Sequence, residues 1–149
     1  MKNLLIIGCV LLSTFSLQCK NPVFMVDIFD SNYSMSYTLH YHITKDSITI
    51  VKLDGLQGTH TVRLLEKKLT VIESNRILNI IKSPAFKSLK HQYKNALIED
   101  GDRKRINIQL DKQKKTIEIA NVYNKEVARL INNVNPVLDE KYKIKYLEK

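Results

Sequence analysis

An alternation of apolar and polar residues constrains the fold most strongly. In SYTLHYHI, residues 36–43, every second residue is large and apolar: Tyr37, Leu39, Tyr41 and Ile43. A period of two is typical of a strand with one buried face. The polar turn TKDS and the β-branched run ITIVKL follow, so residues 36–53 are predicted to form a β-hairpin. VFMVDIF before this hairpin and THTVRLL after it are predicted to be further strands.

The pattern changes to a helical one at Thr70. Thr70 and Glu73 have the spacing of a capping box, in which each side chain satisfies a backbone N–H group at the start of a helix. Isoleucines and a leucine then gather on one side, and Ser83 and Pro84 end the segment, which predicts a helix over residues 71–82. FKSLKHQYK, residues 86–94, is predicted to form a second, short helix.

The second half repeats the order of strands and then a helix. Asp100 and Gly101 suit the centre of a type I′ turn, and the isoleucines of residues 106–119 alternate around the turn at DKQK. A meander of three strands is therefore predicted, with Leu97 on the same face as Ile106. Asn124 is predicted to cap a helix, and Pro136 to end it.

The apolar stripe of this last helix comprises Val127, Leu130, Ile131 and Val134. KYKIKYL, residues 141–147, alternates again and is predicted to be a short closing strand. The whole order predicts an α+β fold, with an antiparallel sheet built from hairpins and meanders and two amphipathic helices packed on one face. The 149 residues, 44% of them hydrophobic, suit a single domain with a packed core.

The N-terminal segment has the organisation of an export signal. LLIIGCVLL, residues 4–12, follows Lys2 and precedes small polar residues, as in a secretory signal peptide. The uncharged span from Asn3 to Gln18 has 16 residues, whereas a membrane-spanning helix needs about 20. A retained membrane anchor is therefore the less favoured alternative.

The stretch SLQCKN resembles the lipobox of bacterial lipoproteins, in which a cysteine at the end of the apolar region receives a lipid. The resemblance covers residues 1–19 and implies lipidation of Cys19. Ser16 and Gln18 stand where that family usually has Leu and a small residue, respectively. Ordinary cleavage after Ser16, which would give a secreted protein, remains an alternative. The expected organisation is a signal peptide over residues 1–18, a short tether over 19–22 and one α+β domain over 23–149.

Cys19 would be the only cysteine left after processing, so no disulfide is expected within the mature chain. The resemblance implies a protein of the cell envelope, a periplasm-facing lipoprotein that is held to the membrane by its N-terminal lipid. The domain is expected to be monomeric.

Positive charge exceeds negative charge along the whole chain. Lys and Arg number 24 against 15 Asp and Glu, a formal net charge of +9. This excess predicts a basic surface formed by Lys87, Lys90, Lys94, Arg103, Lys104 and Arg105. Such a surface suits an acidic protein or another anionic envelope partner. Nucleic acid is not an expected partner, because the chain has no recognition motif for it and an exported protein meets little of it.

The sequence favours a non-catalytic binding module over an enzyme. Nucleophile-elbow, HExxH, phosphate-loop and dinucleotide-binding motifs are all missing from the sequence. A module of the inhibitor, immunity or accessory type, without a cofactor, is therefore expected. The alternative is a metal-dependent hydrolytic enzyme in which His40, His42 and His60 bind zinc, since His40 and His42 project from one strand face about 7 Å apart.

Overall fold

The computed structural model describes residues 23–31, 37–54, 60–98 and 101–147. Seven strands form one sheet in the order β4-β3-β2-β1-β6-β7-β5. The strands are β1 (Phe24–Ser31), β2 (Tyr37–Thr44), β3 (Ser47–Asp54), β4 (His60–Lys68), β5 (Gln92–Lys94), β6 (Arg103–Leu110) and β7 (Gln113–Ala120). The helices are α1 (Val71–Lys82), α2 (Pro84–Lys87) and α3 (Lys125–Val134), followed by the 3-10 turns η1 (Asn135–Val137) and η2 (Glu140–Tyr142). The predicted α+β class is confirmed.

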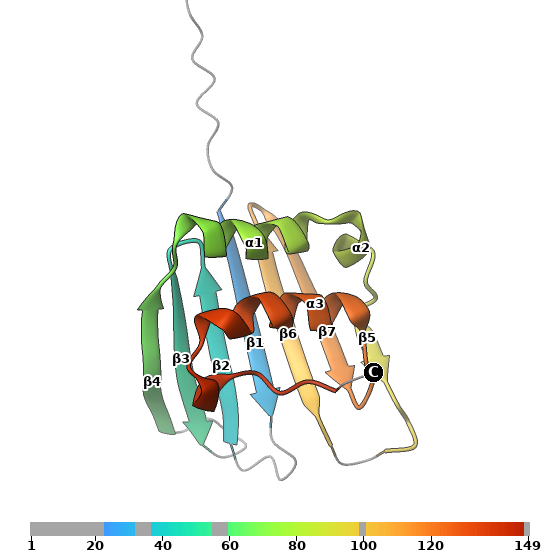
Figure 1. Cartoon of the computed structure of the whole chain (residues 1–149). Coiled ribbons are helices and arrows are strands. Elements are labelled where there is room, and N and C mark those ends of the chain that lie inside the picture. The colour runs from blue at the N-terminus through green and yellow to red at the C-terminus, as the bar shows by residue number, and fades with distance from the viewer. Residues whose placement is uncertain (1–22, 32–36, 55–59, 99–100, 148–149) are drawn as a thin grey trace, which may run out of the picture.

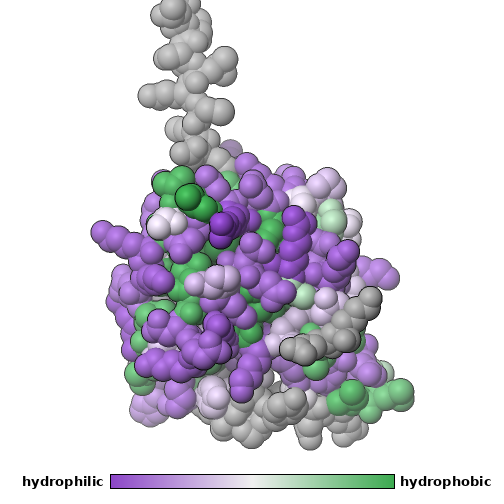
Figure 2. Space-filling model, in the orientation of Figure 1, coloured by the Kyte–Doolittle hydropathy of each residue, from purple (hydrophilic) through white to green (hydrophobic). Residues whose placement is uncertain are grey.

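The sheet is mixed. Across the sheet, every neighbouring pair in the series β4-β3-β2-β1-β6-β7 is antiparallel. The last strand, β5, adds a three-residue parallel pairing beside β7. Helices α1 and α3 cross the same face of the sheet (Figure 1). Figure 2 shows the outer surface on this side as largely hydrophilic, with small hydrophobic patches. No described helix crosses the other face of the sheet, which we call the open face.

The core lies between the sheet and the two long helices. Strand alternation turns one side chain in two toward the helices, and the fully buried strand residues include Val26, Ile28, Tyr41, Ile50, Ile106 and Ile117. The apolar stripe of α3 meets them, since Val127, Leu130, Ile131 and Val134 are at most 1% exposed. The stripe and the hairpin pattern therefore build the core as predicted.

The predicted N-terminal caps are confirmed. At α1, the Thr70 hydroxyl accepts a hydrogen bond from the backbone N–H of Glu73, and the Glu73 carboxylate accepts one from the backbone N–H of Thr70. At α3, the Asn124 side chain accepts hydrogen bonds from Glu126 and Val127. Both helices begin where their sequence predicts.

The prediction of one helix over residues 86–94 is wrong. Ser83 caps α2 by accepting a hydrogen bond from Phe86 N–H, and α2 ends after one turn. The chain then extends, and Tyr93 pairs with Ile119 of β7. A parallel partner 26 residues away in sequence leaves no local pattern, so the helical spacing of Phe86, Leu89 and Tyr93 was misleading.

Two other segments differ from the prediction. Leu97 does not share a face with Ile106, since it is 94% exposed in a turn, and Asp100 of the predicted type I′ turn lies outside the described residues. Residues 141–147 form no strand. Instead, the Asn135 side chain donates a hydrogen bond to the carbonyl of Ile144 and accepts one from its N–H group. This side chain supplies both hydrogen bonds that a neighbouring strand would provide.

The predicted signal peptide, tether and Cys19 lie outside the described residues. Within the described ranges, no helix has the length and apolar character needed to cross a membrane.

Candidate binding face and histidine cluster

Cross-strand pairing arranges the side chains of the open face in rows. One row runs from His40 on β2 through Phe29 and Arg105 to Glu118 on β7. The neighbouring row toward the start of β1 contains His42, Asp27, Asn107 and Thr116, and the row toward its end contains Thr38, Ser31, Arg103 and Ala120. These residues share a face because they alternate with the buried ones.

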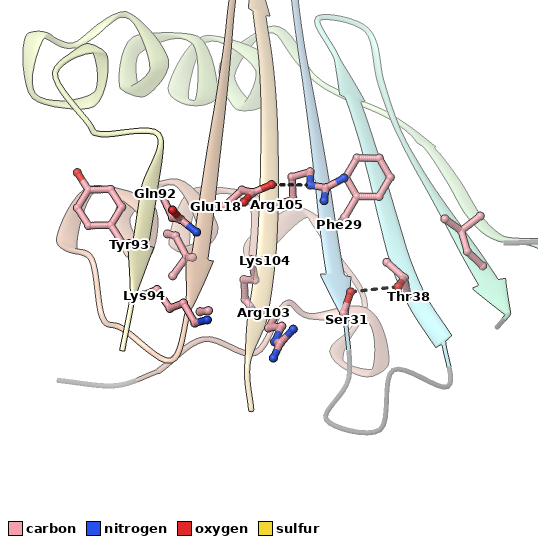
Figure 3. Close-up of a pocket in the computed structure, with 13 residues that line it drawn as sticks. Phe29, Ser31, Thr38, Gln92, Tyr93, Lys94, Arg103, Lys104, Arg105 and Glu118 are labelled. Carbon is pink, nitrogen blue, oxygen red and sulfur yellow. Dashed lines mark hydrogen bonds and ion pairs between the residues drawn. The ribbon is translucent and has the colours of Figure 1, made fainter. Parts of the chain in front are cut away.

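The open face carries a hollow of about 490 Å³. Its apolar lining includes Phe29, Leu53 and Ala120, and its charged lining includes Lys94, Arg103, Arg105 and Glu118. Figure 3 views the sheet from this side, with Lys94 of β5 and Thr38 of β2 toward opposite edges. The lining of the hollow therefore combines apolar and charged side chains.

Positive charge exceeds negative charge among the described residues that line the hollow. Arg105 Nε lies 3.1 Å from a carboxylate oxygen of Glu118, and both side chains are well exposed. Lys94 and Arg103 lie near the same end of the sheet (Figure 3). Among the described lining residues on the open face, Lys94, Arg103 and Arg105 are cationic and Glu118 is anionic, which favours an anionic ligand.

The assignment of Lys104 to a basic surface is wrong. Lys104 shares the core side of β6 with Ile106, and its residue is 3% exposed. Its ammonium lies 2.8 Å from Asp30 Oδ1 and forms a second ion pair with Asp102. The run of three basic residues misled the prediction, because strand alternation sends the middle one inward.

The other predicted basic residues divide between two places. Lys94, Arg103 and Arg105 line the hollow, whereas Lys87, the last residue of α2, and Lys90, on the connection from α2 to β5, are exposed elsewhere. The Lys115 ammonium crosses to this connection and donates hydrogen bonds to the carbonyls of Lys87 and Leu89. The predicted surface is therefore not one continuous patch.

His40 and His42 converge on a third residue, Asp27 of β1. Oδ1 of Asp27 lies 2.8 Å from Nε2 of His40 and 2.7 Å from Nδ1 of His42. Burial opposes ionisation of Asp27, but the two histidine contacts outweigh burial and lower the pKa of its carboxyl group. The Phe29 ring stacks on the His40 ring, with centroids 4.3 Å apart and planes 5° apart. We call Asp27, His40 and His42 the histidine cluster.

His60 does not belong to this cluster. It lies at the start of β4, where it pairs with Asp54 of β3, two strands away from β2. Sequence reasoning missed Asp27 as the third member of the cluster. The available signal was a single acidic residue in the middle of the apolar run VFMVDIF, at the alternating positions that do not enter the core.

The histidine cluster and the hollow are adjacent, because Phe29 lines the hollow and stacks on His40. Chemically, the cluster offers metal ligands or a hydrogen-bond network, and the hollow offers a basic and apolar docking surface. Neither the known protein-family models nor the curated proteins match this chain.

Proposed function

We propose that this chain is a small exported, lipid-anchored envelope protein that acts as a non-catalytic binding module, and that its open sheet face binds an acidic segment of a partner protein. The observation that carries this proposal is the hollow on that face, with cationic Lys94, Arg103 and Arg105 around apolar Phe29 and Leu53. Antiparallel hairpins with two amphipathic helices on one side leave the second side of the sheet available for a partner.

The mixture of charge and apolar surface favours a protein segment over a uniform polyanion. A polyanion engages the cationic lining residues but leaves the apolar ones without a partner, whereas a segment with acidic and apolar side chains engages both. Charge complementarity of this kind mainly raises the rate of association and the specificity. The occupant we propose is therefore an acidic, partly apolar segment of another envelope protein.

The position of the hollow suits attachment through the N-terminus. β1 begins at Phe24, at the end of the sheet that α1 crosses (Figure 1). Its last residue, Ser31, lines the hollow. Seven residue steps separate Phe24 from Ser31, which corresponds to about 24 Å at roughly 3.4 Å per residue. A lipid on Cys19 would therefore place the hollow at the end of the domain that points away from the membrane.

A hydrolytic enzyme built on His40, His42 and His60 has less support. His60 lies two strands from His40, and among the described residues the cluster that suits a metal consists of Asp27, His40 and His42. A metal at this cluster is also compatible with a binding module.

The binding proposal is tested by reversing charge on the open face. The double variant Lys94→Glu, Arg105→Glu and the control Arg76→Glu, Lys82→Glu on α1 are immobilised and exposed to an envelope extract from the native host. We expect one acidic protein to be retained by the wild type and the control and lost from the open-face variant. Equal retention by all three proteins, or displacement by poly-glutamate at equal charge concentration, contradicts the proposed partner.

The anchoring proposal is tested by the intact mass of the mature protein from its native host. We expect a chain that starts at Cys19 and carries added acyl groups. A chain that starts at Leu17, or an uncut Met1, contradicts lipidation.

A further inference from the structure

Three metal-ligating side chains meet on the open face, beside the hollow. The ligand atoms of Asp27, His40 and His42 all lie within 4.8 Å of one another. We propose that this histidine cluster is a binding site for one divalent transition metal ion, with zinc as its natural occupant. This inference does not depend on the proposed binding function, because the site is defined by ligand chemistry alone.

The donor atoms select the class of metal. Two imidazole nitrogens and one carboxylate oxygen suit zinc and its neighbours, whereas calcium and magnesium prefer oxygen ligands throughout. Three protein ligands with a further position left to water or a ligand are characteristic of open zinc sites. Zinc is the favoured occupant because it accepts this set in tetrahedral geometry.

The ligand atoms lie close to the spacing that zinc requires. Zinc bonds of about 2.0–2.1 Å in tetrahedral geometry place neighbouring ligand atoms roughly 3.3 Å apart. Asp27 Oδ1 already lies 2.8 Å and 2.7 Å from the two histidine nitrogens. These two distances therefore have to lengthen by about 0.5 Å, and the two imidazole nitrogens, which lie within 4.8 Å of each other, have to come to the same spacing of roughly 3.3 Å. Side-chain rotations provide both changes, and the ion takes the place of the protons shared with the carboxylate.

The sheet holds the ligands in this arrangement before any ion arrives. Asp27 pairs directly with His42 across β1 and β2, two central strands of the sheet, and His40 lies one row away. Stacking of Phe29 on His40 fixes the plane of that ring. A site on rigid strands loses little conformational freedom when the metal binds.

The site is accessible. The side chains of Asp27, His40 and His42 are 13%, 23% and 38% exposed. They are enclosed enough to limit competing water and open enough for an ion to enter from the open face. The hollow that Phe29 lines is next to these ligands, so water from the open face can complete the coordination.

Calorimetric titration with zinc chloride tests the site. The purified full chain is first treated with chelator and then titrated at pH 7.5. We expect one zinc ion per chain, and at least a tenfold loss of affinity in Asp27→Asn and in His42→Gln. His60→Gln is the matched control, because it removes an exposed imidazole outside the cluster, and we expect its affinity to equal that of the wild type. Absence of binding, or equal affinity in all variants, overturns the proposal.

Nitrogen NMR of the wild-type imidazoles keeps the test independent of variant folding. On addition of one equivalent of zinc, we expect the signals of His40 Nε2 and His42 Nδ1 to shift to ligated positions, while those of His60 and His91 stay unchanged. Shifts confined to His60 or His91 overturn the assignment.

Discussion

Replacing Lys104 by methionine removes a cation that the core side of the sheet holds between two carboxylates. The side chain of Lys104 is 1% exposed, and those of Asp30 and Asp102 are 17% and 16% exposed. Removing one member of a buried ion pair typically lowers the free energy of unfolding by about 3–5 kcal/mol, because the remaining charges lose their partner. We expect a loss of that size for Lys104→Met.

Urea denaturation at pH 7 and 25 °C measures this loss, with Arg105→Met as the control. Arg105 is the next residue of β6, points to the opposite face and is paired with Glu118 in solvent, so its replacement should change stability by less than about 1 kcal/mol. The triple variant Lys104→Met, Asp30→Asn, Asp102→Asn should recover much of the loss, because it leaves no carboxylate without a partner. A loss below about 1 kcal/mol for Lys104→Met would refute the reasoning.

The deficit of Lys104→Met should also depend on pH. Burial raises the pKa of the Asp30 carboxyl group, although Lys104 acts against this rise. Without Lys104, the pKa of the Asp30 carboxyl group in the folded state rises further above its value in the unfolded chain. Between the unfolded-state pKa of Asp30 and its raised folded-state pKa, the folded variant binds more protons than the unfolded chain. The stability of the variant therefore increases as the pH falls through this range. The difference in urea midpoint between the wild type and Lys104→Met should therefore be smaller at pH 4.5 than at pH 7. An equal difference at both pH values would contradict this.

Three further predictions concern separate parts of the fold. The lowered pKa of Asp27 contributes stability that is present above the usual carboxyl pKa of 3.8 and is lost as the pH falls through the lowered pKa. The urea midpoint of Asp27→Asn should therefore decrease less than that of the wild type as the pH falls through this range. Thr70→Ala removes the cap of α1 and should cost about 1 kcal/mol by the same method, whereas an unchanged midpoint would contradict the capping box. Gly101 has φ +149° and its missing Cβ would collide with the Asn121 side chain, so Gly101→Ala should lower stability by about 1–3 kcal/mol, and an unchanged thermal midpoint would refute this.

The parts of the fold that were predictable from the sequence are those with local patterns. The capping box at Thr70, the stripe of α3 and the hairpins β2–β3 and β6–β7 all arise from residues a few positions apart. The parallel strand β5 was not predictable in this way, because its partner is distant in sequence. Residues 141–147 alternate like a strand, yet Asn135 supplies the hydrogen bonds that a strand would need.

The candidate site was predictable only in part, for a similar reason. The HYH motif placed His40 and His42 on one strand face, and alternation located that face opposite the core. Their partner Asp27 comes from a different strand, and only the register between β1 and β2 brings it to His42. The inward position of Lys104 follows from alternation with Ile106, but the basic run concealed it.

Site-specific photocrosslinking in the native host tests the proposed binding face most directly. A photoreactive benzoyl-phenylalanine replaces Leu53, which lines the hollow, or Ile72 on α1, which is 66% exposed on the helix side. We predict crosslinks from position 53 to one acidic envelope protein, their loss when Lys94→Glu and Arg105→Glu are added, and no such crosslinks from position 72. Crosslinks of equal yield from both positions, or from position 72 alone, would contradict the assignment of partner binding to the open face.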